Sequence, residues 1–372
     1  MRLVHYRSLA LGLLLSWNAQ SDAAEPARLP MESRAANEAR LLRDGADGRF
    51  DDCSLLRAAL VASQVSAPTD FQKYEEKFNG WVVTLRRATI NDRSSRDRAV
   101  TTLSLLHREV LIGEYDAGCS DLSATFETGR YNCITATILY WSLLESLQMQ
   151  PIAVHLPGHV RMRIDAAESV EIETTSSSGV SSASAALTMN RGREIAAAPL
   201  VGKLYYNRGL QALTAKDFTE AVQAFEHSLT LDPLDTDARH NLLAALNNGA
   251  LALCERGEYP AANAQLARAA TLDPHYPLLA MNELHLRQRW VVTLCEQKQF
   301  EQALETLLAG AVRQPQAELF RSGQVAVYRL WAAELARRGE RHAALAKLEQ
   351  AIALAPQDQE LARWHATLAG QR

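Results

Sequence analysis

Three residues of this chain have the side chains that nucleophilic acyl transfer requires: Cys133, His159 and Glu173. A thiolate can attack a carbonyl carbon, an imidazole can carry the proton, and a carboxylate can fix the orientation and tautomer of the imidazole. The three residues are far apart in the sequence. The elements around each of them must therefore bring the side chains together.

Cys133 is predicted to lie in the first turn of a buried helix. The segment Ile134–Leu147 is apolar nearly all round, which is typical of a helix enclosed on every side. Asn132 is a favourable N-cap for this helix. The free N–H groups and the positive end of the helix dipole then favour a thiolate and offer donors to an oxyanion. The alternative interpretation is that Cys133 is a structural core cysteine.

His159 and Glu173 are predicted to lie on neighbouring strands. A strand over Ile152–Leu156 is followed by Pro157 and Gly158, and residues 159–164 and 170–175 then alternate between apolar and polar side chains. The two alternating runs predict an antiparallel hairpin. If paired positions sum to 332, His159 lies directly opposite Glu173, and if they sum to 334 the two are diagonal neighbours. In both registers they share one face of the sheet.

Other residues compete for these roles. His155 is a rival base, but its place inside an apolar strand favours a histidine satisfied within the fold. Glu173 could instead pair with Arg161 across the hairpin. Arg130 and Tyr131 are candidates to line the site or to lie on the surface.

The residues around the three candidates carry a family resemblance. The stretches GRYNCITATILY, LPGH and VEIETT resemble the transglutaminase-like superfamily, in particular bacterial members fused to tetratricopeptide (TPR) arrays. The resemblance covers roughly residues 50–180 and implies an α+β domain with a papain-like core. It implies Cys133 as nucleophile, His159 as base and Glu173 as third member, at a position where the superfamily more often has Asp.

The C-terminal half repeats with a period of 41 residues. The shared positions are a proline, an alanine and an aromatic residue, with Arg341 breaking the aromatic rule: Pro233, Pro274, Pro315 and Pro356; Ala221, Ala262, Ala303 and Ala344; Phe218, Tyr259 and Phe300. One helical pattern precedes each alanine and another runs from it to the proline. Such a period with two helices per unit predicts a helical solenoid.

The repeat resembles the TPR pattern of a small residue, an alanine and a proline. Gly209, Ala221 and Pro233 are each 12 residues apart. The usual TPR period is about 34, so seven extra residues per unit predict a lengthened first helix in the later units. The resemblance covers residues 200–356, with a capping helix over 358–370. It implies a concave surface that holds peptides or partner proteins, the alternative being a structural appendage.

The N-terminus predicts export. Arg2 and Arg7 precede a short apolar stretch, and small residues around Ala23 and Ala24 suit a signal-peptide cleavage site. We therefore expect a periplasmic or secreted protein. Of its five cysteines, Cys53 and Cys119 are a candidate disulfide pair. Cys254 and Cys295 occupy equivalent repeat positions and are expected to be too far apart to bridge.

The composition is that of an ordinary globular protein. The 372 residues are 47% hydrophobic and 22% charged, with a formal net charge of −4. These values exclude a disordered chain, a collagen and a coiled-coil rod, and they do not favour a nucleic-acid binder. No apolar run reaches the roughly 20 residues that span a bilayer. No His/Cys cluster has metal-ligand spacing, so no metal or cofactor is implied.

The predicted organisation follows from these observations. It comprises a signal peptide over 1–24, a transglutaminase-like domain over 25–190, a Ser/Ala-rich loop and linker over 176–199, and an all-α TPR array over 200–372. The leading hypothesis is an exported thiol enzyme acting on amide bonds by hydrolysis or acyl transfer, with a module that binds a peptide or protein. The alternative hypothesis is a catalytically silent transglutaminase-like and TPR scaffold that binds partners.

Overall fold

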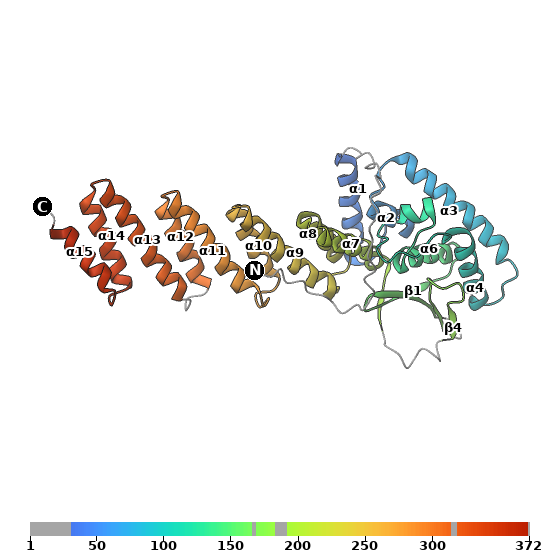
Figure 1. The fold of residues 1–372 in the computed structure, drawn as a ribbon. Coiled ribbons are helices and arrows are strands. Elements are labelled where there is room, and N and C mark those ends of the chain that lie inside the picture. Colours follow the sequence, from blue (N-terminus) through green and yellow to red (C-terminus); the bar gives the residue numbers. More distant parts are fainter. Residues whose placement is uncertain (1–30, 166–168, 183–191, 314–317, 371–372) are drawn as a thin grey trace. The chain divides into compact units, whose positions relative to one another are not determined.

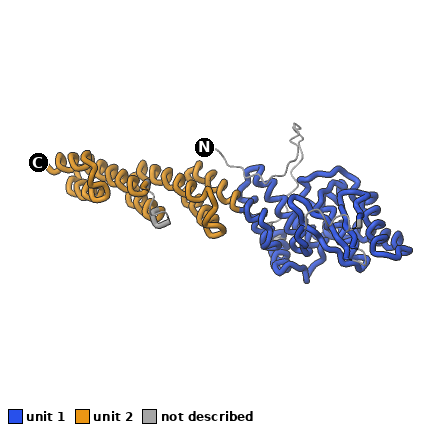
Figure 2. The backbone as a smooth tube through the Cα atoms, turned by 90° about the horizontal axis from the view of Figure 1, so that it is seen from below, with its two compact units in different colours: residues 1–242 blue, residues 243–372 orange. Residues whose placement is uncertain are grey.

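The structure, a computed structural model, describes residues 31–165, 169–182, 192–313 and 318–370. The predicted signal peptide lies outside the described residues. The chain divides into two compact units, residues 1–242 and 243–372 (Figure 2). The first unit combines helices with a five-stranded sheet, and the second is helical in the part that the structure describes.

From residue 31 onward, six α-helices precede the sheet in the first unit. Most of them are labelled in Figure 1. They are α1 (Met31–Asp44), α2 (Leu55–Ala62), α3 (Pro68–Ala88), α4 (Ser95–Leu105), α5 (Leu122–Thr128) and α6 (Cys133–Ser146), with a 3-10 turn at Gly45–Asp47 and a π-helical turn at Leu106–Val110. Local signals set their starts. Ser54 caps α2, Ser94 and Asp97 form a capping box on α4, and Pro68 stands at the start of α3.

Helix α6 lies at the centre of this unit. Every residue from Cys133 to Leu144 is buried, and Ile138, Leu139 and Tyr140 are fully enclosed. The helix contacts α2, α3, α4, α7 and the strands β1 and β2. The apolar pattern around the whole helix therefore reflects neighbours on all sides, as expected from the sequence.

The sheet is antiparallel, in the order β4-β3-β2-β1-β5. Its strands are β1 (Pro151–Leu156), β2 (His159–Ile164), β3 (Val170–Ile172), β4 (Val180–Ser182) and β5 (Arg193–Ile195). The predicted hairpin is confirmed, and the pairs Met162–Ile172 and Ile164–Val170 select the register in which paired positions sum to 334. Gly158, with φ at 71°, makes the two-residue turn that leads directly into His159.

The stretch 176–199 is not only a loop and linker, and this corrects the sequence prediction. Val180–Ser182 forms β4 beside β3, and Arg193–Ile195 forms β5 beside β1. Each strand has only three residues and no clear apolar alternation. Pairing with an already formed neighbour, rather than local propensity, therefore makes them strands. Residues 183–191 lie outside the described residues.

The first helix pair of the repeat array belongs to the first compact unit. It consists of α7 (Ala197–Thr214) and α8 (Phe218–Leu231). Val201, Leu204 and Tyr205 of α7 are fully buried in the same core as α6. Lys203 Nζ also bonds Asp235 Oδ2 at 2.6 Å in a buried ion pair after α8. The compact units therefore divide after Leu242, whereas the sequence placed the domain boundary between residues 190 and 200.

Helix pairs continue along the rest of the chain. Helix α9 (Thr236–Glu255) begins in the first unit and ends in the second. It is followed by α10 (Tyr259–Leu272), α11 (Leu279–Glu296), α12 (Phe300–Arg313), α13 (Glu318–Arg337), α14 (Arg341–Leu354) and the capping helix α15 (Gln359–Gly370). The expected 41-residue period is confirmed, because the second helices begin at Phe218, Tyr259, Phe300 and Arg341.

The repeat positions have packing roles. The alanines at 221, 262, 303 and 344 are fully buried. Tyr259 stacks on Trp290, and Phe300 stacks on Trp331 one period later. The first helix of every unit has 18 or 20 residues, whereas the second has 14. The sequence predicted a long first helix only in the later units, but α7 in the first unit is long as well. Pro315 lies outside the described residues.

Candidate functional site

Cys133, His159 and Glu173 meet at one end of the sheet. His159 is the first residue of β2, and Glu173 directly follows β3, so the antiparallel pairing brings both to the same end. The Thr137 and Thr174 hydroxyls are 3.0 Å apart and tie α6 to the segment after β3. Because Thr137 lies one helical turn after Cys133, this contact places the start of α6 beside the other two residues.

The imidazole of His159 bridges the other two side chains. Its Nε2 lies 2.6 Å from Glu173 Oε2. The interaction with the Cys133 thiol is the first of the causes that raise the pKa of the ring. The side chains of His159 and Glu173 are 32% and 37% exposed, so solvent reaches the pair. Cys133 is 8% exposed at the base of the site.

The electrostatics of the site favour a protonated His159 ring. The hydrogen bonds with Cys133 and Glu173 raise the pKa of His159 to about 10, although partial burial opposes the shift. Burial raises the pKa of Glu173, but the hydrogen bonds from His159 and Thr175 outweigh it and leave that pKa below its usual value. The arrangement is therefore suited to an imidazolium held next to the Glu173 carboxylate.

The start of α6 is held by a capping box. Asn132 Oδ1 accepts hydrogen bonds from the N–H groups of Ile134 and Thr135, both at 2.9 Å, and Thr135 Oγ1 accepts from the Asn132 N–H at 3.0 Å. The Asn132 amide also donates to the Ala117 carbonyl at 3.4 Å. Cys133 thus stands at the first helical position with a backbone fixed on both sides.

Glu173 has partners of its own that orient the carboxylate. Its Oε1 accepts from Thr175 N at 3.1 Å and from Thr175 Oγ1 at 2.5 Å. The ring Nε2 of His107 lies 3.0 Å from the Thr174 carbonyl and further fixes this segment. Thr175 and His107 were not singled out from the sequence, because neither stands in a pattern that marks a site.

The competing residues lie elsewhere. Arg161 Nε pairs with Glu171 Oε2 at 3.2 Å, so this arginine has a partner other than Glu173. His155 lies among charged groups that include Lys203, Asp235 and Arg193. Its pKa is lowered, mainly because the ring is partly buried. Arg130 is exposed and lies 3.7 Å from Asp116.

Tyr115 is a member of the site that sequence reasoning missed. Burial, together with the charges of Cys133 and Glu173, raises the pKa of its hydroxyl. Its ring meets that of Tyr131 edge to face, with the centroids 5.8 Å apart. The segment between the π-helical turn and α5 has no regular periodicity, so the sequence offered no signal for this residue.

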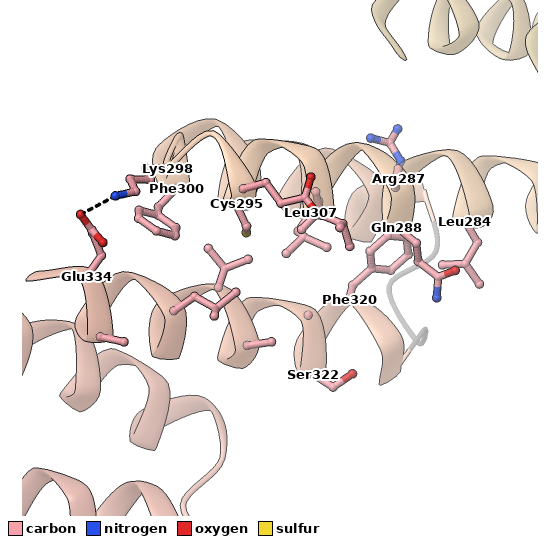
Figure 3. Close-up of a pocket in the computed structure, with 18 of the residues that line it drawn as sticks. Leu284, Arg287, Gln288, Cys295, Lys298, Phe300, Leu307, Phe320, Ser322 and Glu334 are labelled. Atoms are coloured by element: carbon pink, nitrogen blue, oxygen red, sulfur yellow. Dashed lines mark hydrogen bonds and ion pairs between the residues drawn. The ribbon is translucent and has the colours of Figure 1, made fainter. Parts of the chain in front are cut away.

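The second unit contains a separate apolar cavity of about 810 Å³ lined by α11, α12 and α13 (Figure 3). Phe300, Leu307 and Phe320 contribute apolar side chains to it. At one end, Lys298 Nζ bonds Glu334 Oε1 at 2.9 Å. Val292 and Leu330 also line the cavity and are 56% and 50% exposed, so apolar surface is open to solvent here.

Among the described residues, no group of three or more His, Cys, Asp or Glu side chains is arranged to hold a metal ion. Nor does any helix in the described ranges have the length and apolar character needed to cross a membrane. The five cysteines all lie in described segments and are free thiols, including Cys53 and Cys119.

Of the comparisons with known proteins, only the search of solved structures finds similar chains. A scan against models of protein families finds no match, and no curated protein matches this chain. The crystal structure of the P58(IPK) TPR domain is similar at 13% identity over 92% of this chain and 81% of that chain, with a TM-score of 0.21. Because so low a TM-score does not indicate a shared overall arrangement, the TPR-like assignment rests on the helix pairs and their period.

Proposed function

We propose that the first unit is a transglutaminase-like thiol enzyme that cleaves or transfers the acyl group of an amide bond. The observation that carries the proposal is the His159 ring, which lies 2.6 Å from Glu173 Oε2 and whose pKa is raised by its interactions with Cys133 and Glu173. A cysteine at a capped helix start, a histidine on a strand and an acid beside the next strand are also what a papain-like core would require, which supports the proposal. The family resemblance of the sequence around these residues points the same way.

The chemistry follows from the positions of the three side chains. The Cys133 thiolate attacks the amide carbonyl carbon, a carbon–sulfur bond forms, and the carbonyl electrons move to the oxygen. The imidazolium of His159 gives its proton to the leaving amine as the carbon–nitrogen bond breaks. Water or an amine then attacks the thioester, with His159 taking up a proton, and Cys133 is released. Glu173 holds the ring and favours its charged form throughout.

Alkylation of Cys133 by iodoacetamide tests this proposal. We expect modification at pH 6 that is far faster than that of the other four cysteines, with the site identified by mass spectrometry. His159→Ala should slow it by at least about tenfold, because the thiolate loses its cationic partner. His155→Ala is the matched control and should leave the rate unchanged. If Cys133 reacts no faster than Cys295, the catalytically silent scaffold is the better description.

The helix pairs support a second role, a module that binds a peptide or a protein. The observation that favours it is the apolar cavity in the second unit, with Val292 and Leu330 half exposed at its lining. Selection of displayed peptides on the full-length protein would test this. We expect the selected peptides to lose binding to Leu330→Glu, while Leu308→Glu, another exposed leucine, serves as control. Peptides that bind both variants equally would place the binding surface elsewhere.

Export remains part of the proposal through the sequence of residues 1–24. The basic start, the short apolar stretch and the small residues before Glu25 support a cleaved signal. N-terminal sequencing of the protein from an extracytoplasmic fraction should begin at Ala24 or Glu25. A chain recovered from the cytoplasm with Met1 intact would oppose export.

A further inference from the structure

Thr174 is a fully buried residue that links the segment after β3 to two other parts of the first unit. It directly follows Glu173, and it is 0% exposed. Its hydroxyl lies 3.0 Å from that of Thr137 on α6, and its carbonyl oxygen lies 3.0 Å from Nε2 of His107. Because a carbonyl oxygen only accepts hydrogen bonds, His107 is the donor and its Nε2 carries the hydrogen. Thr174 is therefore held by two separate segments of the chain.

His107 lies in the π-helical turn that follows α4. The Leu111 N–H donates to the Leu106 carbonyl at 2.9 Å, so the hydrogen bond of this turn spans five residues instead of the four of an α-helix. Side chains in such a turn point in directions that differ from those of a continuing α-helix. Turns of this kind are rare and occur frequently at functional sites. Here the turn presents the imidazole of His107 to the residue next to Glu173.

The same imidazole also contacts the segment that leads into Cys133. It meets the ring of Tyr131 edge to face, with the two ring centroids 6.2 Å apart. Tyr131 immediately precedes the cap of α6, and its carbonyl accepts a hydrogen bond from the Asp116 N–H at 2.8 Å. One side chain, that of His107, therefore contacts both the neighbour of Glu173 and the approach to Cys133.

Loss of the His107 donor would disturb the site through Thr174. A buried carbonyl that loses its hydrogen-bond partner is costly, and the segment can find another partner only by moving. Glu173 is the adjacent residue, and its carboxylate lies 2.6 Å from the ring of His159. A movement of Thr174 therefore displaces the Glu173–His159 pair relative to α6, and acyl transfer is sensitive to displacements of about 1 Å.

We infer that His107 is a positioning residue for the proposed acyl transfer, which holds the Glu173–His159 pair in place relative to the start of α6. This inference rests on the proposed function of the first unit. His107 acts through its hydrogen bond to Thr174 and its contact with Tyr131, and it has no role on the substrate itself.

Alkylation of Cys133 by iodoacetamide over a range of pH tests this role in the full-length protein. His107→Leu removes the donor, whereas His107→Gln keeps an N–H group that can reach the same carbonyl. In His107→Leu we expect the midpoint of the rate–pH profile to rise by about one pH unit and the rate at pH 6 to fall about tenfold, because the displaced His159 ring stabilises the thiolate less well. In His107→Gln the rate at pH 6 should stay within about threefold of wild type.

A second pair of variants tests the other contact of Thr174 and decides the question if His107→Leu does not fold. Thr137→Val removes the hydroxyl that meets Thr174 and should raise the midpoint as well, whereas Thr137→Ser keeps a hydroxyl and should not. Tyr140→Phe is the matched control, because it removes a buried hydrogen bond from α6 to the Ala99 carbonyl at 2.9 Å. It should leave the profile unchanged.

The possible outcomes separate this inference from the proposed function. If His107→Gln reacts as slowly as His107→Leu, or if the Leu and Val variants keep the wild-type midpoint, His107 is not a positioning residue. An equal shift in Tyr140→Phe would also contradict the inference, because a general loss of stability would then explain the effect. If wild-type Cys133 reacts no faster than Cys295, the proposed function itself fails.

Discussion

At the scale of single residues, His159 is the centre of the candidate site. Its ring bonds Glu173 through Nε2, and the interactions with Cys133 and Glu173 raise its pKa, so the charged form of the ring is favoured. Thr175 fixes the Glu173 carboxylate. His159, Glu173 and Cys133 could be predicted from the sequence because each stands in a helix or strand pattern. Tyr115 could not be predicted, because its position depends on the close approach of two irregular segments.

The raised pKa of His159 predicts a pH dependence of stability. Because the folded-state pKa of about 10 exceeds the unfolded value of about 6.5, the folded state gains from the charged ring. This gain is fully present below pH 6.5 and is lost as the pH rises through about 10. The difference in unfolding free energy between wild type and His159→Gln, from urea denaturation, should therefore shrink steadily between pH 6.5 and pH 10. A constant difference over that range would contradict the interpretation.

At the scale of elements, the capped start of α6 and the turn before β2 position the reactive groups. The sequence predicted the N-cap, the buried helix and the hairpin, because capping and alternation are local signals. It left two registers open, since both place the same side chains on one face, and tertiary packing selected one of them. The strands β4 and β5 were missed because three residues of mixed polarity become a strand only beside an existing sheet.

The cap of α6 should matter for reactivity as well as stability. Asn132→Ala removes two hydrogen bonds at the helix start and should lower the unfolding free energy by about 1–2 kcal/mol. It should also slow alkylation of Cys133, because the first turn loses its fixed geometry. Asp217→Ala removes the cap of α8 and is the matched control, with a similar loss of stability and an unchanged alkylation rate. If Cys133 is alkylated at the same rate in both variants, the cap of α6 does not contribute to the reactivity of Cys133.

At the scale of the whole molecule, the boundary between the two compact units does not coincide with the start of the repeat array. The 41-residue repeat begins with α7 and α8, yet the core of the first unit includes Leu204 and Tyr205 of α7 and Leu231 of α8. The buried pair of Lys203 and Asp235 fastens the end of α8 to α7. A helix pair with the repeat pattern therefore completes the domain that carries the candidate site.

This division predicts which fragments fold. A fragment of residues 25–242 should be soluble, unfold cooperatively and keep the rapid alkylation of Cys133. A fragment of residues 25–199 lacks most of α7 and all of α8 and exposes the core face of α6, so we expect it to aggregate or unfold. Proteolysis resistance and alkylation of both fragments would check this. If the 25–199 fragment is stable and its Cys133 is alkylated rapidly, the domain boundary lies where the sequence predicts it.

The sequence by itself determined the features that depend on local order: the repeat period, the buried helix after Asn132, the alternating hairpin and the types of the three candidate site residues. Only the tertiary structure decided the strand register, the two short outer strands, the place of Tyr115 and the inclusion of α7 and α8 in the first core. The physical reason is that periodicity and capping act between residues close in the chain. Close approach and shared burial depend on residues that are distant in it.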